Sequence, residues 1–194
     1  MPTLKLPKIL LYFICICLFL MPAEDAVCAD LPNNNQWQRL ETKHTTLQYH
    51  AEKDLEQFNN MIDYSPASMG LQGLFSKPDS DDFTDKIKQK VDAVYQRVQE
   101  ILDMRKMMNK ININIYPDQK ELHAAYYDMF QKTCNLRAWY IYETNTIYIN
   151  AADMHEGILA HEMAHGIIDH FLSVRPPAAT AEILARYVDG HLFD

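Results

Sequence analysis

This sequence contains little glycine and little cysteine, and it has fewer basic than acidic residues. Its 194 residues include only 5 Gly and 4 Cys, with 48% hydrophobic and 23% charged residues. This composition is typical of one ordinary globular domain, and it argues against disorder, collagen and repeat arrays. Because 18 Lys and Arg face 26 Asp and Glu, a protein that binds nucleic acid by neutralising phosphates is disfavoured. We therefore expect no nucleic-acid partner.

The longest apolar run lies near the start and is too short to span a membrane. It covers thirteen residues, 9–21, follows a basic segment, and is followed by small residues that end at Ala29. A spanning helix needs about 20 apolar residues, whereas this layout is typical of a secretory signal peptide. We expect residues 1–29 to be a cleaved signal peptide, with no stable membrane span afterwards. Residues 30–194 are then a single domain, exported to the periplasm or the medium.

Intramolecular disulfide bonds are also excluded from the expected mature chain. Three of the four cysteines lie in the signal peptide, so only Cys134 remains after cleavage. An exported domain without disulfides must be held together by its hydrophobic core or by a metal ion.

Hydrophobic periodicity in the remaining sequence predicts an α+β fold with a small mixed sheet. Apolar residues recur every three or four positions over residues 81–107, which indicates a long amphipathic helix. Ile111, Ile113 and Ile115 alternate with asparagines, as in a half-buried strand. The other expected elements are a strand over 46–49, helices over 54–62 and 118–130, a loop over 65–80, a hairpin of strands 138–142 and 146–150, a helix that begins at a capping box of Asp153 and Glu156 and ends at Val174, and a last helix from Thr180 to Val188.

The chemically informative motif lies in the second-last helix. Residues His161 to His165 read HEMAH, an HExxH sequence. Residues four apart lie about 40° apart around a helix, so both imidazoles project from one face and can bind one ion. Two imidazoles and a carboxylate suit zinc, whose fourth position holds water in catalytic sites. Glu162 lies beside that face, where it can take a proton from the zinc-bound water.

A third protein ligand is needed, and spacing distinguishes three candidates. His170 is five residues after His165, about 140° around the helix, which makes it a poor ligand. Asp169 lies on the same face and could bind the metal, but we expect it to hydrogen-bond the far nitrogen of an imidazole. Glu182 opens the next helix after a Pro-Pro turn, where the returning chain could bring its carboxylate against the first helix. We favour Glu182, and the alternative is that it only complements the helix dipole.

These residues resemble a known family. Residues 158–169 (ILAHEMAHGIID), the following Pro-Pro pair, and residues 181–187 (AEILARY) are similar to the gluzincin metallopeptidases, in particular the small peptidase MA-like domains. The family usually has a small residue after its last glutamate, where this chain has Ile183. Residues 138–150 are similar to the family's edge hairpin, and residues 37–49 to its first strands.

The resemblance implies a zincin-like fold and a set of roles. It implies His161 and His165 as zinc ligands, Glu162 as catalytic base and Glu182 as third ligand, with one Zn²⁺ per chain. The active-site helix then carries HExxH, and the C-terminal helix carries the third ligand.

Substrate binding and transition-state stabilisation are less closely defined. An extended peptide could pair with either strand of the hairpin 138–150 and lie across the zinc. The developing oxyanion also needs a donor besides the metal. Tyr187 is the candidate that we name, with His191 and Tyr140 as alternatives, although core packing is the commoner role for such aromatic residues.

Two functions follow from the motif. The first is an exported zinc metallopeptidase, in which a zinc-bound water activated by Glu162 hydrolyses a peptide or protein substrate. The second is a non-catalytic, zinc-stabilised module that binds a protein partner on the hairpin. Glu162 favours the first, because a structural zinc needs no base beside it and usually has four protein ligands.

Overall fold

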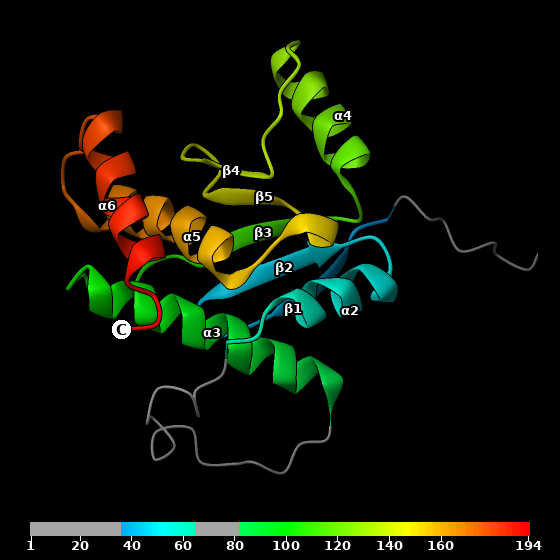
Figure 1. Ribbon diagram of the computed structural model, residues 1–194, viewed down its shortest axis with the longest axis horizontal. Helices are drawn as coiled ribbons and strands as arrows, with labels where there is room; N and C mark the ends of the chain where they lie inside the picture. Colours follow the sequence, from blue (N-terminus) through cyan, green and yellow to red (C-terminus); the bar gives the residue numbers. More distant parts are fainter. Residues whose placement is uncertain (1–35, 65–81) are drawn as a thin grey trace, which may run out of the picture. The chain divides into compact units, whose positions relative to one another are not determined.

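The computed structural model describes residues 36–64 and 82–194, all within one compact unit, Asn34–Asp194. The fold is α+β, as the sequence predicts: helices pack against a small, mixed, five-stranded sheet (Figure 1). The expected signal peptide, residues 1–29, and the expected loop, residues 65–80, lie outside the described residues. No helix in the described part of the chain is long and apolar enough to cross a membrane.

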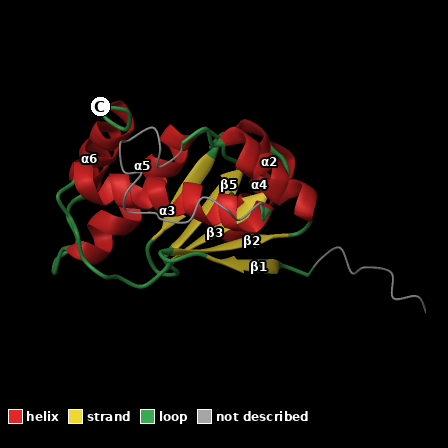
Figure 2. Cartoon of the chain, turned by 90° about the horizontal axis from the view of Figure 1, so that it is seen from below, coloured by secondary structure: helices red, strands yellow, loops and turns green. Residues whose placement is uncertain are grey.

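The sheet has a parallel centre and antiparallel margins. Its order is β1-β2-β3-β5-β4, in which β2, β3 and β5 run parallel to one another. The outer strands β1 and β4 run antiparallel to their neighbours, and Figure 2 shows β1 at one edge. Because β5 is paired on both sides, β4 is the strand of the hairpin with a free edge. The bounds are β1 Gln38–Glu41, β2 Thr45–Tyr49, β3 Ile111–Tyr116, β4 Ala138–Ile141 and β5 Thr146–Asn150.

The core lies between one face of the sheet and four of the helices. Ile111, Ile113 and Ile115 are buried, whereas the asparagines between them are only partly buried, so the alternation separates the core face from the other face. α5 packs against β4 and β5, α3 packs against α5, α6 packs along α5, and α2 packs against β2 and β3. The helices are α2 Glu52–Met61, α3 Phe83–Ile101, α4 Gln119–Phe130, α5 Glu156–Phe171 and α6 Ala178–Gly190, with a short 3-10 helix at Ala151–Asp153.

The opposite face of the sheet carries aromatic side chains and α4. Trp139 and Tyr148 form a stacked pair across β4 and β5, with ring centroids 5.1 Å apart. Tyr126 of α4 meets the Trp139 ring edge-on at 5.1 Å. Side chains alternate along a strand, so this pair lies on the face away from Ile147 and Ile149, which belong to the core. α4 therefore covers the second face near the free edge.

Several expected helix ends are wrong, for local reasons. The expected cap Asp153 lies in the 3-10 helix and forms an ion pair with Arg137, and α5 begins after His155 without a side-chain cap. α3 ends at Ile101 instead of 107, because Asp103 adopts a left-handed conformation (φ 52°). The Asp103 and Met104 N–H groups then donate to the carbonyls of residues 100 and 99, the pattern of a Schellman motif.

The C-terminal helices also have different limits from those expected. α5 stops at Phe171, three residues before Val174, and α6 begins at Ala178, after Pro177, and runs to Gly190. Proline has no N–H to lose at a helix start, so Pro177 is compatible with the cap position.

Candidate metal centre

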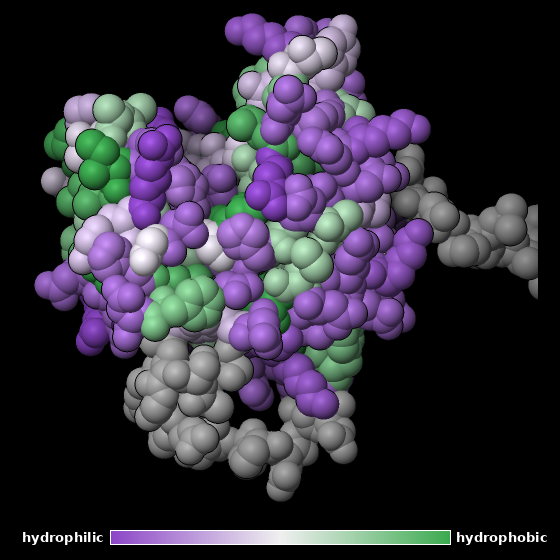
Figure 3. Space-filling model, viewed as in Figure 1, coloured by the Kyte–Doolittle hydropathy of each residue, from purple (hydrophilic) through white to green (hydrophobic). Residues whose placement is uncertain are grey.

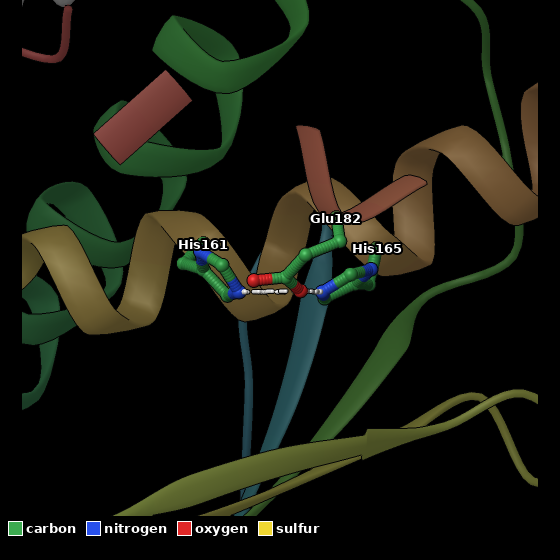
Figure 4. Close-up of side chains that lie close together, drawn as sticks. All are labelled: His161, His165 and Glu182. Atoms are coloured by element: carbon green, nitrogen blue, oxygen red, sulfur yellow. Dashed lines mark hydrogen bonds and ion pairs between the residues drawn. The ribbon is translucent and has the colours of Figure 1, made fainter. Parts of the chain in front are cut away.

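Helix α5 presents the two histidines of the HExxH sequence to the same space. The helix is buried over most of its surface, with Met163 and Ala164 fully buried in the core between the two histidines. His161 and His165 are instead only partly buried, and their imidazoles point toward one another (Figure 4). Their Nε2 atoms are 3.3 Å apart. The spacing of four residues therefore places two nitrogen donors at one point.

Helix α6 supplies a carboxylate to the same point. The chain turns back through Pro176 and Pro177, and α6 packs closely along α5. Oε2 of Glu182 lies 3.6 Å from Nε2 of His161 and 3.5 Å from Nε2 of His165. Figure 4 shows this carboxylate oxygen between the two imidazoles. The three residues form a group whose donor atoms all lie within 4.8 Å of one another.

The geometry of these three donors fits a tetrahedral zinc ion. Zinc bonds to nitrogen and carboxylate oxygen are about 2.0–2.1 Å long, so two ligands of a tetrahedral ion lie about 3.3–3.4 Å apart. The observed separations are 3.3, 3.5 and 3.6 Å. The donor set of two imidazoles and one carboxylate also suits zinc and leaves one position for another ligand.

Glu162 is buried beside this group. Its side chain lines the same cavity as the three donors, but it makes no hydrogen bond or ion pair with any residue that the structure describes. Burial, reinforced by the nearby Glu182 carboxylate, raises the pKa of Glu162 to about 8. Burial therefore favours the neutral form of this carboxyl group, and no residue that the structure describes competes for its oxygens.

The electrostatics of the donors follow from their surroundings. Arg186 donates from Nε to Oε1 of Glu182 at 2.7 Å, and this hydrogen bond is the main reason that the pKa of Glu182 is lowered. Burial lowers the pKa of His165, and His161 acts in the same direction, while Glu182 and Asp169 oppose the shift. A carboxylate and a neutral imidazole are the forms that bind a metal.

A cavity of about 610 Å³ surrounds the site. The edge strand β4 contributes Ala138, Trp139 and Tyr140 to its lining, and α5 and α6 contribute the three donor residues. In Figure 3 the outline of the molecule is notched between α6 and α4, and hydrophobic residues gather over α6. The free edge of β4 and the donor group therefore open onto one space.

The structure brings together the three candidate ligands favoured from the sequence. The two other ligand candidates, Asp169 and His170, have different partners. Asp169 makes no hydrogen bond to either imidazole, contrary to expectation. It is buried, its Oδ2 lies 3.0 Å from Nε of Arg175, and its Oδ1 has no hydrogen-bond partner. His170 is turned away, and its Nε2 lies 2.9 Å from the hydroxyl of Tyr140.

The expected oxyanion donor, Tyr187, does not line the cavity. It lies five residues after Glu182 and therefore on a different side of α6, where its ring stacks on His191 with centroids 3.9 Å apart. His191 accordingly lies away from the cavity as well. Of the three aromatic candidates, only Tyr140 lines it, with its hydroxyl also 3.1 Å from Oδ1 of Asn145.

Arg175 is a cavity residue that the sequence did not single out. It lies in the connection between α5 and α6 and lines the cavity, but it belongs to no recognisable sequence motif. The one sequence signal was its position directly before the two prolines, which indicates the end of a helix and says nothing about a partner.

Comparisons with protein-family models, curated proteins and solved structures found no match to this chain.

Proposed function

We propose that this protein is a zinc-dependent peptidase. The observation that carries the proposal is the set of three donor atoms, 3.3–3.6 Å apart, with an unpartnered and buried glutamate beside them. A structural zinc usually has four protein ligands. Here three donors converge in an open cavity, which is the arrangement of a catalytic site that keeps one position for water or substrate.

In the proposed site, His161, His165 and Glu182 hold the ion. When bound, zinc polarises a carbonyl group and lowers the pKa of water, which is the chemistry that peptide hydrolysis requires. Arg186 donates a 2.7 Å hydrogen bond to Oε1 of Glu182, which favours the orientation in which Oε2 faces the two imidazoles.

Glu162 acts as the general base in this proposal. Its carboxylate faces the cavity and has no hydrogen bond to another described residue, so its oxygens are available to the attacking water. Accepting a proton from that water and passing it to the leaving nitrogen is the part of hydrolysis that the protein itself must supply.

The edge strand β4 provides a way to hold the substrate. β4 has a free edge, and three of its residues line the cavity that contains the donors. An extended peptide that adds to this edge satisfies its own backbone groups and runs past the site. β5 cannot serve in this way, because both of its edges are paired.

Cleavage of a mixed peptide library by the zinc-loaded protein tests the proposal. We expect the wild-type protein to cleave library members and Glu162→Gln to lose about 10²–10⁴-fold in rate, the usual contribution of a general base. The variant should keep its zinc, because Glu162 is not a ligand in the proposed site. Glu56→Gln, on the exposed side of α2, is the matched control and should retain wild-type activity.

Two results would contradict the proposal. Full activity in Glu162→Gln would remove the proposed base. Zinc bound to a wild-type protein that cleaves no peptide would favour the second function, a zinc-stabilised module that binds a protein partner.

A further inference from the structure

The cavity contains a cation that the proposed hydrolysis does not use. Among the described residues that line the cavity, Arg175 carries the one permanent positive charge, and its side chain is 53% exposed. The rest of its lining includes three carboxylates, Glu162, Asp169 and Glu182. Two of these have roles in the proposed site, and the third is paired with Arg175 itself.

Contacts on two sides hold the Arg175 guanidinium in place. Its Nε lies 3.0 Å from Oδ2 of Asp169, a residue of α5 that is only 5% exposed. Its Cζ lies 4.5 Å from the centroid of the Tyr142 ring, a cation–π distance. Tyr142 in turn stacks on His170, with ring centroids 5.0 Å apart. The guanidinium is therefore pre-organised at the wall of the cavity.

The two outer nitrogens of this guanidinium, Nη1 and Nη2, are available to bind another group. Nε is engaged by Asp169, whereas Nη1 and Nη2 have no hydrogen bond or ion pair with another described residue. These two groups present parallel N–H donors, an arrangement that matches the two oxygens of a carboxylate. A fixed guanidinium with a free fork is the usual form of a carboxylate-recognising site.

The position of Arg175 relates this fork to the metal-binding group. Its partner Asp169 is four residues after His165 on the same helix, which corresponds to about 6 Å along the axis. An extended peptide covers that distance in about two residues. A carboxylate bound by Arg175 would thus lie within about two residues of a carbonyl group at the donors.

We infer that Arg175 is a specificity residue that binds a carboxylate of the peptide, either an acidic side chain or the C-terminal carboxylate, near the bond to be cut. The inference rests on the proposed function for the identity of the ligand as a peptide. It assigns a substrate class to the cavity: peptides with a carboxylate within about two residues of the reactive carbonyl.

Retention of matched peptides by a variant that does not cut them tests this inference. The probe is a peptide library in pairs that differ only as Glu against Gln, Asp against Asn, or a free against an amidated C-terminus. Zinc-loaded Glu162→Gln is mixed with the library, and retained members are counted by ultrafiltration and mass spectrometry. We expect carboxylate members to be retained about tenfold or more over their amide partners, since hydrogen bonds between charged groups have this effect.

Arg175→Gln, added to Glu162→Gln, should bring that ratio close to one. Arg105→Gln is the matched control, because Arg105 is 68% exposed, pairs with Glu100 and does not line the cavity; it should leave the ratio unchanged. Arg175→Lys keeps a positive charge beside the buried Asp169 but lacks the fork, so it should lower the ratio in a protein with an unchanged circular dichroism spectrum.

The outcomes separate this inference from the proposed function. Enrichment of the side-chain pairs, or of the C-terminal pairs alone, supports it and identifies the source of the carboxylate. Equal retention of both members of every pair, no retention of any peptide, or a ratio that survives both Arg175 variants overturns it. Because retention needs no cleavage, these results can be read even if the wild-type protein cleaves nothing.

Discussion

The two glutamates of the candidate site are held in opposite ways, which agrees with their proposed roles. Glu182 is anchored by Arg186 at 2.7 Å, so one of its oxygens keeps a fixed direction toward the imidazoles. Glu162 is buried without a partner among the described residues. A ligand gains from a fixed direction, whereas a base must leave its oxygens free to exchange a proton.

A residue outside the site makes stability depend on pH. His44 is half-buried and stacks on the Tyr95 ring, with centroids 4.4 Å apart and planes 8° from parallel. Burial lowers the pKa of His44; Lys43 and Lys110 act in the same direction, and Asp92 opposes them. The folded protein therefore favours the neutral imidazole, while the unfolded chain binds a proton below about pH 6.5.

We predict that His44 contributes a decrease in the free energy of unfolding as the pH is lowered from 7 to 5, because the unfolded chain binds more protons at this residue in that range. His44→Phe keeps a ring on Tyr95 but cannot titrate, so the free energy of unfolding of the wild type should fall relative to that of this variant over the same range. Urea unfolding of metal-free protein at several pH values measures the slope of the free energy of unfolding against pH for both proteins. The other titrating groups, including Glu162 with its raised pKa, contribute equally to the two. Equal slopes would show that His44 is not a source of the pH dependence.

At the scale of elements, α5 and α6 differ in how deeply they are buried. Ile168 of α5 is fully buried, whereas Ile183 of α6 is 68% exposed, although both lie one residue from a candidate site residue. α5 is therefore a core helix that carries the histidines, and α6 is a surface helix that covers them.

The same substitution on the two helices should have very different effects. Ile168→Ala removes fully buried methyl groups and leaves a cavity, so we expect a loss of about 2–5 kcal/mol in the free energy of unfolding. Ile183→Ala, its matched control, should change that free energy by no more than about 0.5 kcal/mol. Urea denaturation followed by circular dichroism measures both. Similar losses in the two variants would contradict the burial described here.

Periodic elements were predictable, and their ends were not. Alternating isoleucines predict β3 because one face of a strand must be buried, and the recurrence of apolar residues predicts α3 for the equivalent reason. The stop of α3 at Ile101 depends on the left-handed conformation of Asp103. Aspartate adopts that conformation only in certain contexts, so the residue type alone does not predict the end of the helix.

At the scale of the whole molecule, the candidate site depends on which segments the fold brings together. The spacing of His161 and His165 predicts two donors on one helix face, since this follows from helix geometry alone. The position of Glu182 depends on how α6 packs back along α5, and the contact between Arg175 and Asp169 depends on the path of the chain between these helices. Spacing along the sequence predicts neither the position of Glu182 nor the contact between Arg175 and Asp169.

The zinc content of the purified protein tests the central claim most directly. After dialysis against zinc and then against zinc-free buffer, mass spectrometry of the metal should find one zinc per chain in the wild type and in Glu162→Gln. Glu182→Ala should hold much less, because it removes one of three donors. No zinc in the wild-type protein, or one zinc per chain retained in both Glu182→Ala and His165→Ala, would contradict the account.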